Sequence, residues 1–141
     1  MKHMLSVLAV LAASQAAPAQ DFAALARQGE KGVPALIAVL KDSDAKARGH
    51  AAYALGLIGP AAKGAASELA RALEDEDLAL PGQAAFALGK IGPAAGDAVV
   101  KVLEKGNAKA SVLAARALAT MKAPVKGAAA PLLAALKKET T

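Results

Sequence analysis

The sequence has no cysteine and no tryptophan, and its 141 residues include only one tyrosine and two phenylalanines. Without cysteine the chain forms no disulfide and offers no thiolate as a nucleophile or metal ligand. We expect no cysteine-linked lipoprotein anchor for the same reason. Hydrophobic residues make up 55% of the chain. Because large rings are scarce among them, the core must consist of small aliphatic side chains. This composition favours helices that approach one another closely.

The N-terminal segment predicts an export signal. Residues 4–13 form a nearly unbroken apolar run after a short basic start, and a small-x-small triplet ends at Ala19. A membrane-spanning helix needs about 20 apolar residues, and this run is roughly half that length. We therefore expect residues 1–19 to be a signal peptide and residues 20–141 to be one mature domain. The product is expected to be periplasmic or secreted, with no stable membrane anchor after cleavage.

The strongest pattern in the chain is a sequence repeat with a period of 33 residues. The segment YALGLIGP at 53–60 returns as FALGKIGP at 86–93. A fixed period of this length is typical of repeat proteins, in which each unit buries its apolar face against its neighbours. No linker long enough to divide the chain into two domains interrupts the pattern.

Four apolar columns recur in register along the chain, with steps of 33 or 30 residues. They are Phe22, Leu55, Leu88 and Leu118; Leu25, Ile58, Ile91 and Met121; Leu36, Leu69, Val99 and Leu132; and Leu40, Leu73, Leu103 and Leu136. Within each unit the first two columns lie three residues apart and the last two lie four apart, which is the spacing of one helical face. Each unit is therefore predicted to contain two helices, A and then B.

The predicted boundaries follow from capping residues and helix breakers. The A helices are expected at about 21–28, 45–58, 78–91 and 108–122, and the B helices at about 32–41, 61–74, 94–105 and 125–138. Asp44, Asp77 and Asn107 precede the second to fourth A helices and are expected N-caps. Gly59 and Gly92, each followed by proline, are expected to end A helices. The first repeat is partial because signal cleavage shortens its A helix.

Two further features concern the interior of the A helices. Pro81, followed by glycine, lies inside the third A helix and is expected to delay or kink its start. Gly56 and Gly89 share one column with Ala119. Glycine inside a helix costs about 1 kcal/mol relative to alanine. We expect close approach of the neighbouring helix to offset that cost.

These residues carry a family resemblance. The segment AAYALGLIG at 51–59, followed by an apolar B helix and an acidic turn, resembles HEAT repeats. The segment VPALIAVLKDSD at 33–44 is similar to the HEAT-like type named after phycobilisome lyases. The resemblance covers 21–138 and implies an all-α solenoid of about four helix pairs. It says little about function, because such repeats serve in scaffolds, lyases, transport factors and DNA-binding enzymes. Arg48 stands where the family commonly has an arginine, whereas Pro81 takes the equivalent place one repeat later.

The sequence shows no catalytic constellation, so we expect no enzyme activity, no cofactor and no metal. His50 is the single histidine of the predicted mature chain, and zinc usually needs three or four ligands, which favours a helix-surface role. The acidic run 74–77 offers oxygens for a hard cation but has no glycine-containing loop. Capping and interaction with a helix N-terminus are the favoured roles for it. Tyr53 and Phe86 share a column that is expected to be partly buried packing.

The net charge of +5 raises the question of an anionic partner. Basic residues recur on the predicted B helices, which in such solenoids typically line the concave surface. Acidic residues interrupt that row, and aromatic residues that would stack on bases are lacking, so we expect no nucleic-acid partner.

We therefore expect a non-catalytic interaction or scaffold module that binds a protein or peptide partner on the B helices. The candidate contacts project between the core columns and are Lys63, Ser67, Arg71, Asp97, Lys101 and Ala134. Two alternatives are a bilin lyase-like enzyme, which the repeat subtype implies and export disfavours, and a nucleic-acid-binding HEAT-like protein. Docking of the N-terminal end on a partner or on a second copy is a further expectation, because the shortened first helix is expected to cover that end poorly.

Overall fold

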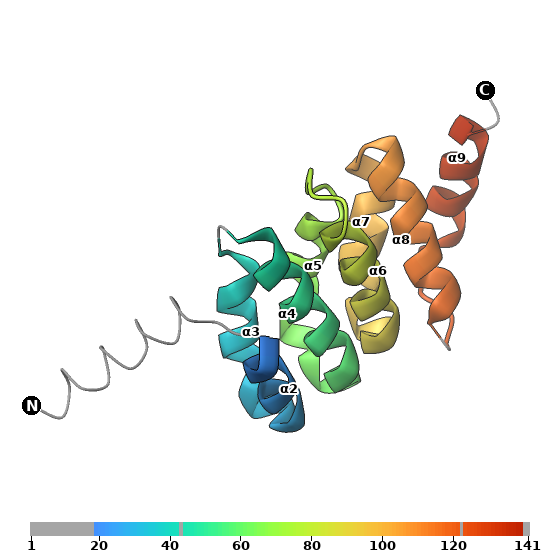
Figure 1. Ribbon diagram of the computed structural model, residues 1–141. Coiled ribbons are helices and arrows are strands. Elements are labelled where there is room, and N and C mark those ends of the chain that lie inside the picture. Colours follow the sequence, from blue (N-terminus) through green and yellow to red (C-terminus); the bar gives the residue numbers. More distant parts are fainter. Residues whose placement is uncertain (1–18, 43, 122, 140–141) are drawn as a thin grey trace, which may run out of the picture.

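The structure is a computed structural model that describes residues 19–42, 44–121 and 123–139. Every regular element within these ranges is a helix, and the helices stack side by side from α2 at one end to α9 at the other (Figure 1). The predicted signal peptide lies almost wholly outside the described residues. In the described part of the chain, no helix combines the length and the apolar character that crossing a membrane requires.

The helices alternate between two layers, as the repeat pattern predicts. The A layer consists of α2 (Ala19–Arg27), α4 (Ala45–Ile58), α6 (Leu80–Ile91) and α8 (Ala108–Thr120). The B layer consists of α3 (Val33–Leu40), α5 (Ala66–Ala72), α7 (Gly96–Lys105) and α9 (Ala129–Glu139). Short 3₁₀ turns join A to B in the first three units: η1 (Gly29–Gly32), η2 (Gly59–Ala65) and η3 (Pro93–Ala95). The all-α solenoid of four helix pairs is confirmed.

The B helices begin later than predicted. Gly59 and Gly92 end α4 and α6 with φ angles of +77° and +85°, a conformation that glycine adopts without steric cost. The proline that follows each glycine lies at or near the start of a 3₁₀ turn rather than of an α-helix, so α5 begins only at Ala66. Gly127, with φ of +80°, likewise delays α9 to Ala129. The apolar periodicity cannot distinguish a 3₁₀ turn from the first turn of an α-helix.

The predicted N-caps are confirmed for two A helices. The Asp44 carboxylate accepts a hydrogen bond from the Lys46 backbone N–H at 3.0 Å. The Asn107 side chain accepts one from the Ala110 backbone N–H at 2.8 Å. Each bond satisfies one of the amides that a helix leaves unpaired at its start. These caps explain why α4 and α8 begin at Ala45 and Ala108, the predicted positions.

Asp77 lies two residues before Ala79, the residue at the N-cap position of α6. Its Oδ2 atom accepts hydrogen bonds from the backbone N–H groups of Ala79 at 3.1 Å and Leu80 at 2.9 Å. The α6 helix starts at Leu80, not at 78, and carries Pro81 near its start. The delay expected from Pro81 is thus confirmed, and Asp77 closes the turn that leads into the helix.

The hydrogen bond from the Leu80 backbone N–H is the main cause that lowers the pKa of Asp77, while burial opposes it. A carboxyl whose pKa is lower in the folded state stabilises the fold above its unfolded-state pKa of about 3.9. This contribution is lost as the pH falls through the folded-state pKa. We therefore expect Asp77→Asn, which keeps an acceptor, to melt below the parent protein at pH 7 and to approach it below about pH 4. Thermal melts across that range test this, and a constant difference would contradict it.

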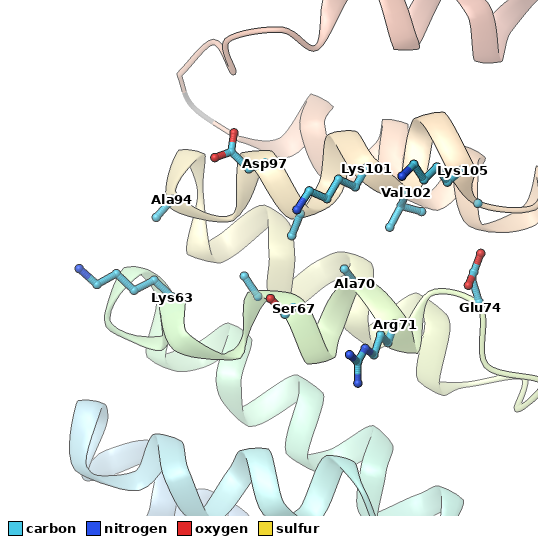
Figure 2. Close-up of a pocket in the computed structure, with 13 residues that line it drawn as sticks. Lys63, Ser67, Ala70, Arg71, Glu74, Ala94, Asp97, Lys101, Val102 and Lys105 are labelled. Atoms are coloured by element: carbon cyan, nitrogen blue, oxygen red, sulfur yellow. The ribbon is translucent and has the colours of Figure 1, made fainter.

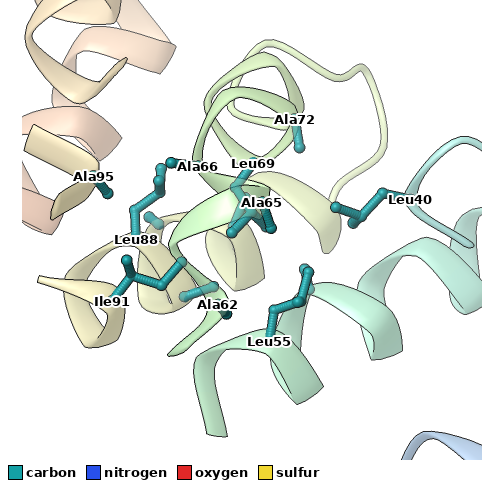
Figure 3. Packing of buried hydrophobic residues seen from close by; sticks show 14 of the residues in the cluster. Leu40, Leu55, Ala62, Ala65, Ala66, Leu69, Ala72, Leu88, Ile91 and Ala95 are labelled. Atoms are coloured by element: carbon teal, nitrogen blue, oxygen red, sulfur yellow. The ribbon is translucent and has the colours of Figure 1, made fainter. Parts of the chain in front are cut away.

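The core lies between the two layers and consists of the aliphatic columns. Leu55, Leu69 and Leu88 are fully buried, and Figure 3 shows them packed with alanines from α5 and the adjoining turns. The most extensive helix contact in the described structure is between α4 and α6. Neighbouring helices therefore contact one another more extensively in the A layer than in the B layer.

Close approach at the glycine column is also confirmed. A Cβ atom added at Gly56 would lie 3.1 Å from the Ala87 Cα and 2.6 Å from the Phe86 ring. At Gly89 it would collide with the Thr120 hydroxyl and lie 3.4 Å from the Ala117 carbonyl oxygen. Contacts this short leave no room for a side chain.

Exposure at the two ends differs from expectation. Phe22 and Leu36 are buried in the first unit, because α2 packs across α4 and α3. The expected poor cover at the N-terminal end is therefore wrong. At the other end Leu136 is 56% exposed, whereas Leu103, in the same column one repeat earlier, is 3% exposed. The apolar surface is at α9, where the described structure places no further helix pair.

A polar bridge joins α4 to the turns that precede and follow the second helix pair. The Arg48 guanidinium donates from Nη1 to the Asp42 carbonyl oxygen at 2.8 Å and from Nη2 to the Asp75 carboxylate at 3.4 Å. Asp42 and Asp75 lie 33 residues apart. Their carboxylates form the same turn, accepting from the backbone N–H two residues later at 2.9 Å in both units. Pro81 holds the place equivalent to Arg48, so the bridge is not repeated there.

Candidate functional site

An open groove of about 490 Å³ runs between α5 and α7 in the B layer, and we call it the B-layer groove. Five of the six predicted contact residues line it: Lys63, Ser67, Arg71, Asp97 and Lys101. Figure 2 shows Ser67 and Arg71 on one helix and Lys101 on the other, with Lys63 and Asp97 at one end. The sixth, Ala134, is exposed on α9 and does not line the groove. The structure therefore places in one groove five residues that the sequence pattern predicts individually.

The floor of the groove consists of residues that sequence reasoning missed. Ala66 and Ala70 lie four residues apart on α5, and Ala98 faces them from α7 beside Val102. Because alanine has no atoms beyond Cβ, the two helices leave space between their exposed faces. In the sequence, the floor is indicated by two alanines four residues apart on one B helix and by another alanine on the next B helix.

The rim of the groove is predominantly cationic. It has four basic side chains, those of Lys63, Arg71, Lys101 and Lys105, and two acidic ones, those of Glu74 and Asp97. The Glu74 carboxylate accepts a hydrogen bond from the Asn107 backbone N–H at 3.4 Å. It therefore also ties this part of the groove to the next repeat.

Arg71 is held at the rim by a neighbour on its own helix. Its Nη1 atom lies 3.7 Å from the Glu68 carboxylate, which in turn lies 3.9 Å from the Lys41 ammonium on the preceding repeat. The Arg71 side chain is 80% exposed, so this pair contributes only about 0–1 kcal/mol to stability. A guanidinium has five N–H donors, and this single contact leaves others for a ligand.

The aromatic column lies on the A layer, away from the groove. The Tyr53 and Phe86 rings stack with centroids 5.4 Å apart and planes 18° apart, and the Phe22 ring lies 5.6 Å from His50. Tyr53 is 45% exposed, while Phe86 is half-buried. These contacts join consecutive A helices, so the rings pack between repeats as predicted.

The acidic run 74–77 has structural partners. Besides the Glu74 bond, the Asp75 carboxylate binds Arg48, and Asp77 caps the turn before α6. Within the described residues, no three side chains of the metal-ligating types His, Cys, Asp and Glu lie close enough together to hold an ion. The positions of these carboxylates favour the capping role over the cation-binding one.

Comparison with known proteins identifies the repeat. A family model described as HEAT repeats matches residues 33–119, the part of the chain from the start of α3 to the end of α8. A search of curated proteins finds no match.

Proposed function

The chain belongs to the HEAT-repeat family, and from that premise we propose that it is a non-catalytic interaction module whose B layer binds a protein or peptide partner. HEAT repeats commonly mediate interactions between proteins. Family membership alone does not identify a function, because one fold serves many purposes. The observation that carries this proposal is the B-layer groove, which combines an alanine floor with a rim of polar and charged side chains.

The groove has the composition of a contact surface rather than of a catalytic pocket. It contains no histidine, and its floor is apolar and small. Interfaces between proteins typically surround an apolar centre with a polar rim. The bilin lyase-like alternative depends on the phycobilisome-lyase subtype, which stays a prediction. A nucleic-acid partner is disfavoured because Glu74 and Asp97 lie on the same rim as the cations.

We further propose that the protein acts outside the cytoplasm, as a periplasmic or secreted module. The support is the sequence of residues 1–19, a basic start and apolar run followed by a small-residue cleavage pattern. Mass spectrometry of the protein recovered from the envelope or the medium tests this. A mature N-terminus at Gln20 is expected, and an intact Met1 start in the cytoplasm would contradict export.

The binding function is tested by cross-linked affinity capture with a charge-reversed groove. Arg71→Glu combined with Lys101→Glu places two acids at the middle of the rim. If the partner binds there, its recovery should fall about tenfold or more, because removing a central contact typically costs about 2 kcal/mol. The two substituted residues are exposed, so the fold should persist, and thermal melts check this.

The matched control reverses two exposed cations on the A layer. Lys109→Glu with Arg116→Glu changes the net charge equally but lies on α8, outside the groove. The control should recover the partner at the parent level. Equal recovery with all three proteins would reject the groove as the binding face. Recovery of only the bait and its own copies would instead favour self-association.

A further inference from the structure

We propose that the B-layer groove recognises a short acidic segment of a partner protein, with a pair of carboxylates seated between Arg71 and Lys101. This inference rests on the proposed function and specifies the chemistry of its partner. The argument starts from how charge is distributed along the groove. The α5 and α7 helices run side by side, and charged side chains face one another at three levels (Figure 2). Asp97, Lys101 and Lys105 come from α7, whereas Lys63 comes from η2, Arg71 from α5 and Glu74 from the turn after α5.

The three levels differ in sign. One end of the groove has Lys63 and Asp97, and the other has Lys105 and Glu74. Each end therefore has one positive and one negative side chain. The middle level contains only Arg71 and Lys101. The acid nearest to Arg71 in the described structure is Glu68, which lies on its own helix and does not line the groove. The excess positive charge is therefore concentrated at the centre.

The length of the groove limits the length of the segment. From Lys63 to Glu74 the chain advances eleven residues along η2 and α5, which corresponds to about 16 Å at the helical rise. An extended peptide covers that distance with about five residues. One or two of these residues can lie at the middle level, and the remainder lie beside the mixed ends.

The floor suits a main chain that lies close to the helices. Ala66, Ala70 and Ala98 present only methyl groups there, so a peptide backbone can approach without displacing side chains. The Ser67 hydroxyl, which also lines the groove, both donates and accepts hydrogen bonds and can pair with a backbone group of the segment. Val102 offers an apolar contact for a neighbouring aliphatic side chain.

The same pattern disfavours a nucleic acid. A polynucleotide carries a phosphate at every residue, so a strand along the groove would place charge beside Asp97 and Glu74 as well as at the centre. No aromatic side chain lines the groove to stack on bases. A peptide with acids only at its middle avoids both end carboxylates.

Fluorescence anisotropy with synthetic peptides tests the proposal on the purified protein. The probe is a fluorescein-labelled hexapeptide of sequence ALEELA with blocked termini, and the reference is its uncharged analogue ALQQLA. We expect the acidic peptide to bind with an affinity that falls at higher salt, and the uncharged peptide to bind about tenfold or more weakly. Arg71→Glu with Lys101→Glu should lower the affinity for the acidic peptide by a similar factor, whereas Lys109→Glu with Arg116→Glu should not.

Several outcomes would overturn the inference. Equal binding of the two peptides would remove the role of the carboxylates, and equal losses with both double variants would show diffuse attraction by net charge. Tighter binding of a single-stranded oligonucleotide, abolished by the groove variant, would assign the groove to nucleic acid. If ALEELA fails to bind while the captured partner still depends on Arg71 and Lys101, the interaction module stands and the acidic-segment inference fails. If recovery of the captured partner does not change with the groove variant, the proposed function is rejected, and the acidic-segment inference is rejected with it.

Discussion

Gly89→Leu should lower the free energy of unfolding by about 2 kcal/mol or more, the range for inserting carbon atoms into a packed contact. Even a Cβ atom at Gly89 would collide with the Thr120 side chain and press on the Ala117 carbonyl of α8. The higher helix propensity of leucine recovers only about 1 kcal/mol. For a chain of this size the melting temperature should fall by roughly 8 °C. Thermal denaturation followed by circular dichroism measures this change.

The same substitution elsewhere in α6 provides the control. Gly82 is exposed, and a Cβ atom added there would meet nothing within 4 Å. Gly82→Leu should therefore leave the melting temperature unchanged or raise it, because only the propensity gain of up to about 1 kcal/mol remains. If both leucine variants lost stability equally, close packing of α6 against α8 would not be the reason for glycine at position 89.

Arg48→Met should cost about 2 kcal/mol, within the range for hydrogen bonds to charged groups. The Arg48 side chain is only 17% exposed, and it contacts both the Asp42 carbonyl and the Asp75 carboxylate. Methionine keeps most of the aliphatic length but leaves those oxygens without their donor. Because these contacts join α4 to the turns that precede and follow the second repeat, chemical denaturation should show a lower midpoint.

Two comparisons separate the bridge from a general effect of charge. Arg116→Met removes an exposed arginine from α8 and should change stability by less than about 0.5 kcal/mol. In a double-mutant cycle, Arg48→Met and Asp75→Asn should cost less together than the sum of their separate effects. Strict additivity would show that the two side chains contribute independently and that no inter-repeat bridge exists.

Much of the fold was predictable because each repeat uses the same local signals. The α4 helix spans 45–58 as predicted, since Asp44 caps its start and Gly59 ends it. The short B helices are less predictable: residues 61–65 are predicted as the start of a B helix, but the structure places them in a 3₁₀ turn. The coverage of the N-terminal end was also mispredicted, because it depends on how α2 lies across α4 in space.

The candidate site was predictable in part. Lys63, Arg71 and Lys101 were found because residues that project between buried columns must face solvent. The same rule also predicts Ala134, but this residue lies on α9, where the described structure has no following B helix to complete a groove. The alanine floor is not predicted because alanines in a helical apolar pattern are indistinguishable from core residues, and Ala66 and Ala70 are indeed largely buried. It becomes informative only when the facing residue on the next helix is known to be equally small.

The place of the groove within the array has a consequence for local unfolding. A stack of repeats gains stability from each unit and from each nearest-neighbour contact, and its outermost units have only one such contact. Among the described helices, fraying is therefore easiest in the outermost units, such as that of α9 with its exposed Leu136, and it has a free-energy cost below that of global unfolding. The B-layer groove is formed by the second and third units, each flanked by a further unit. It can therefore persist as an intact surface through openings that transiently release either end of the chain.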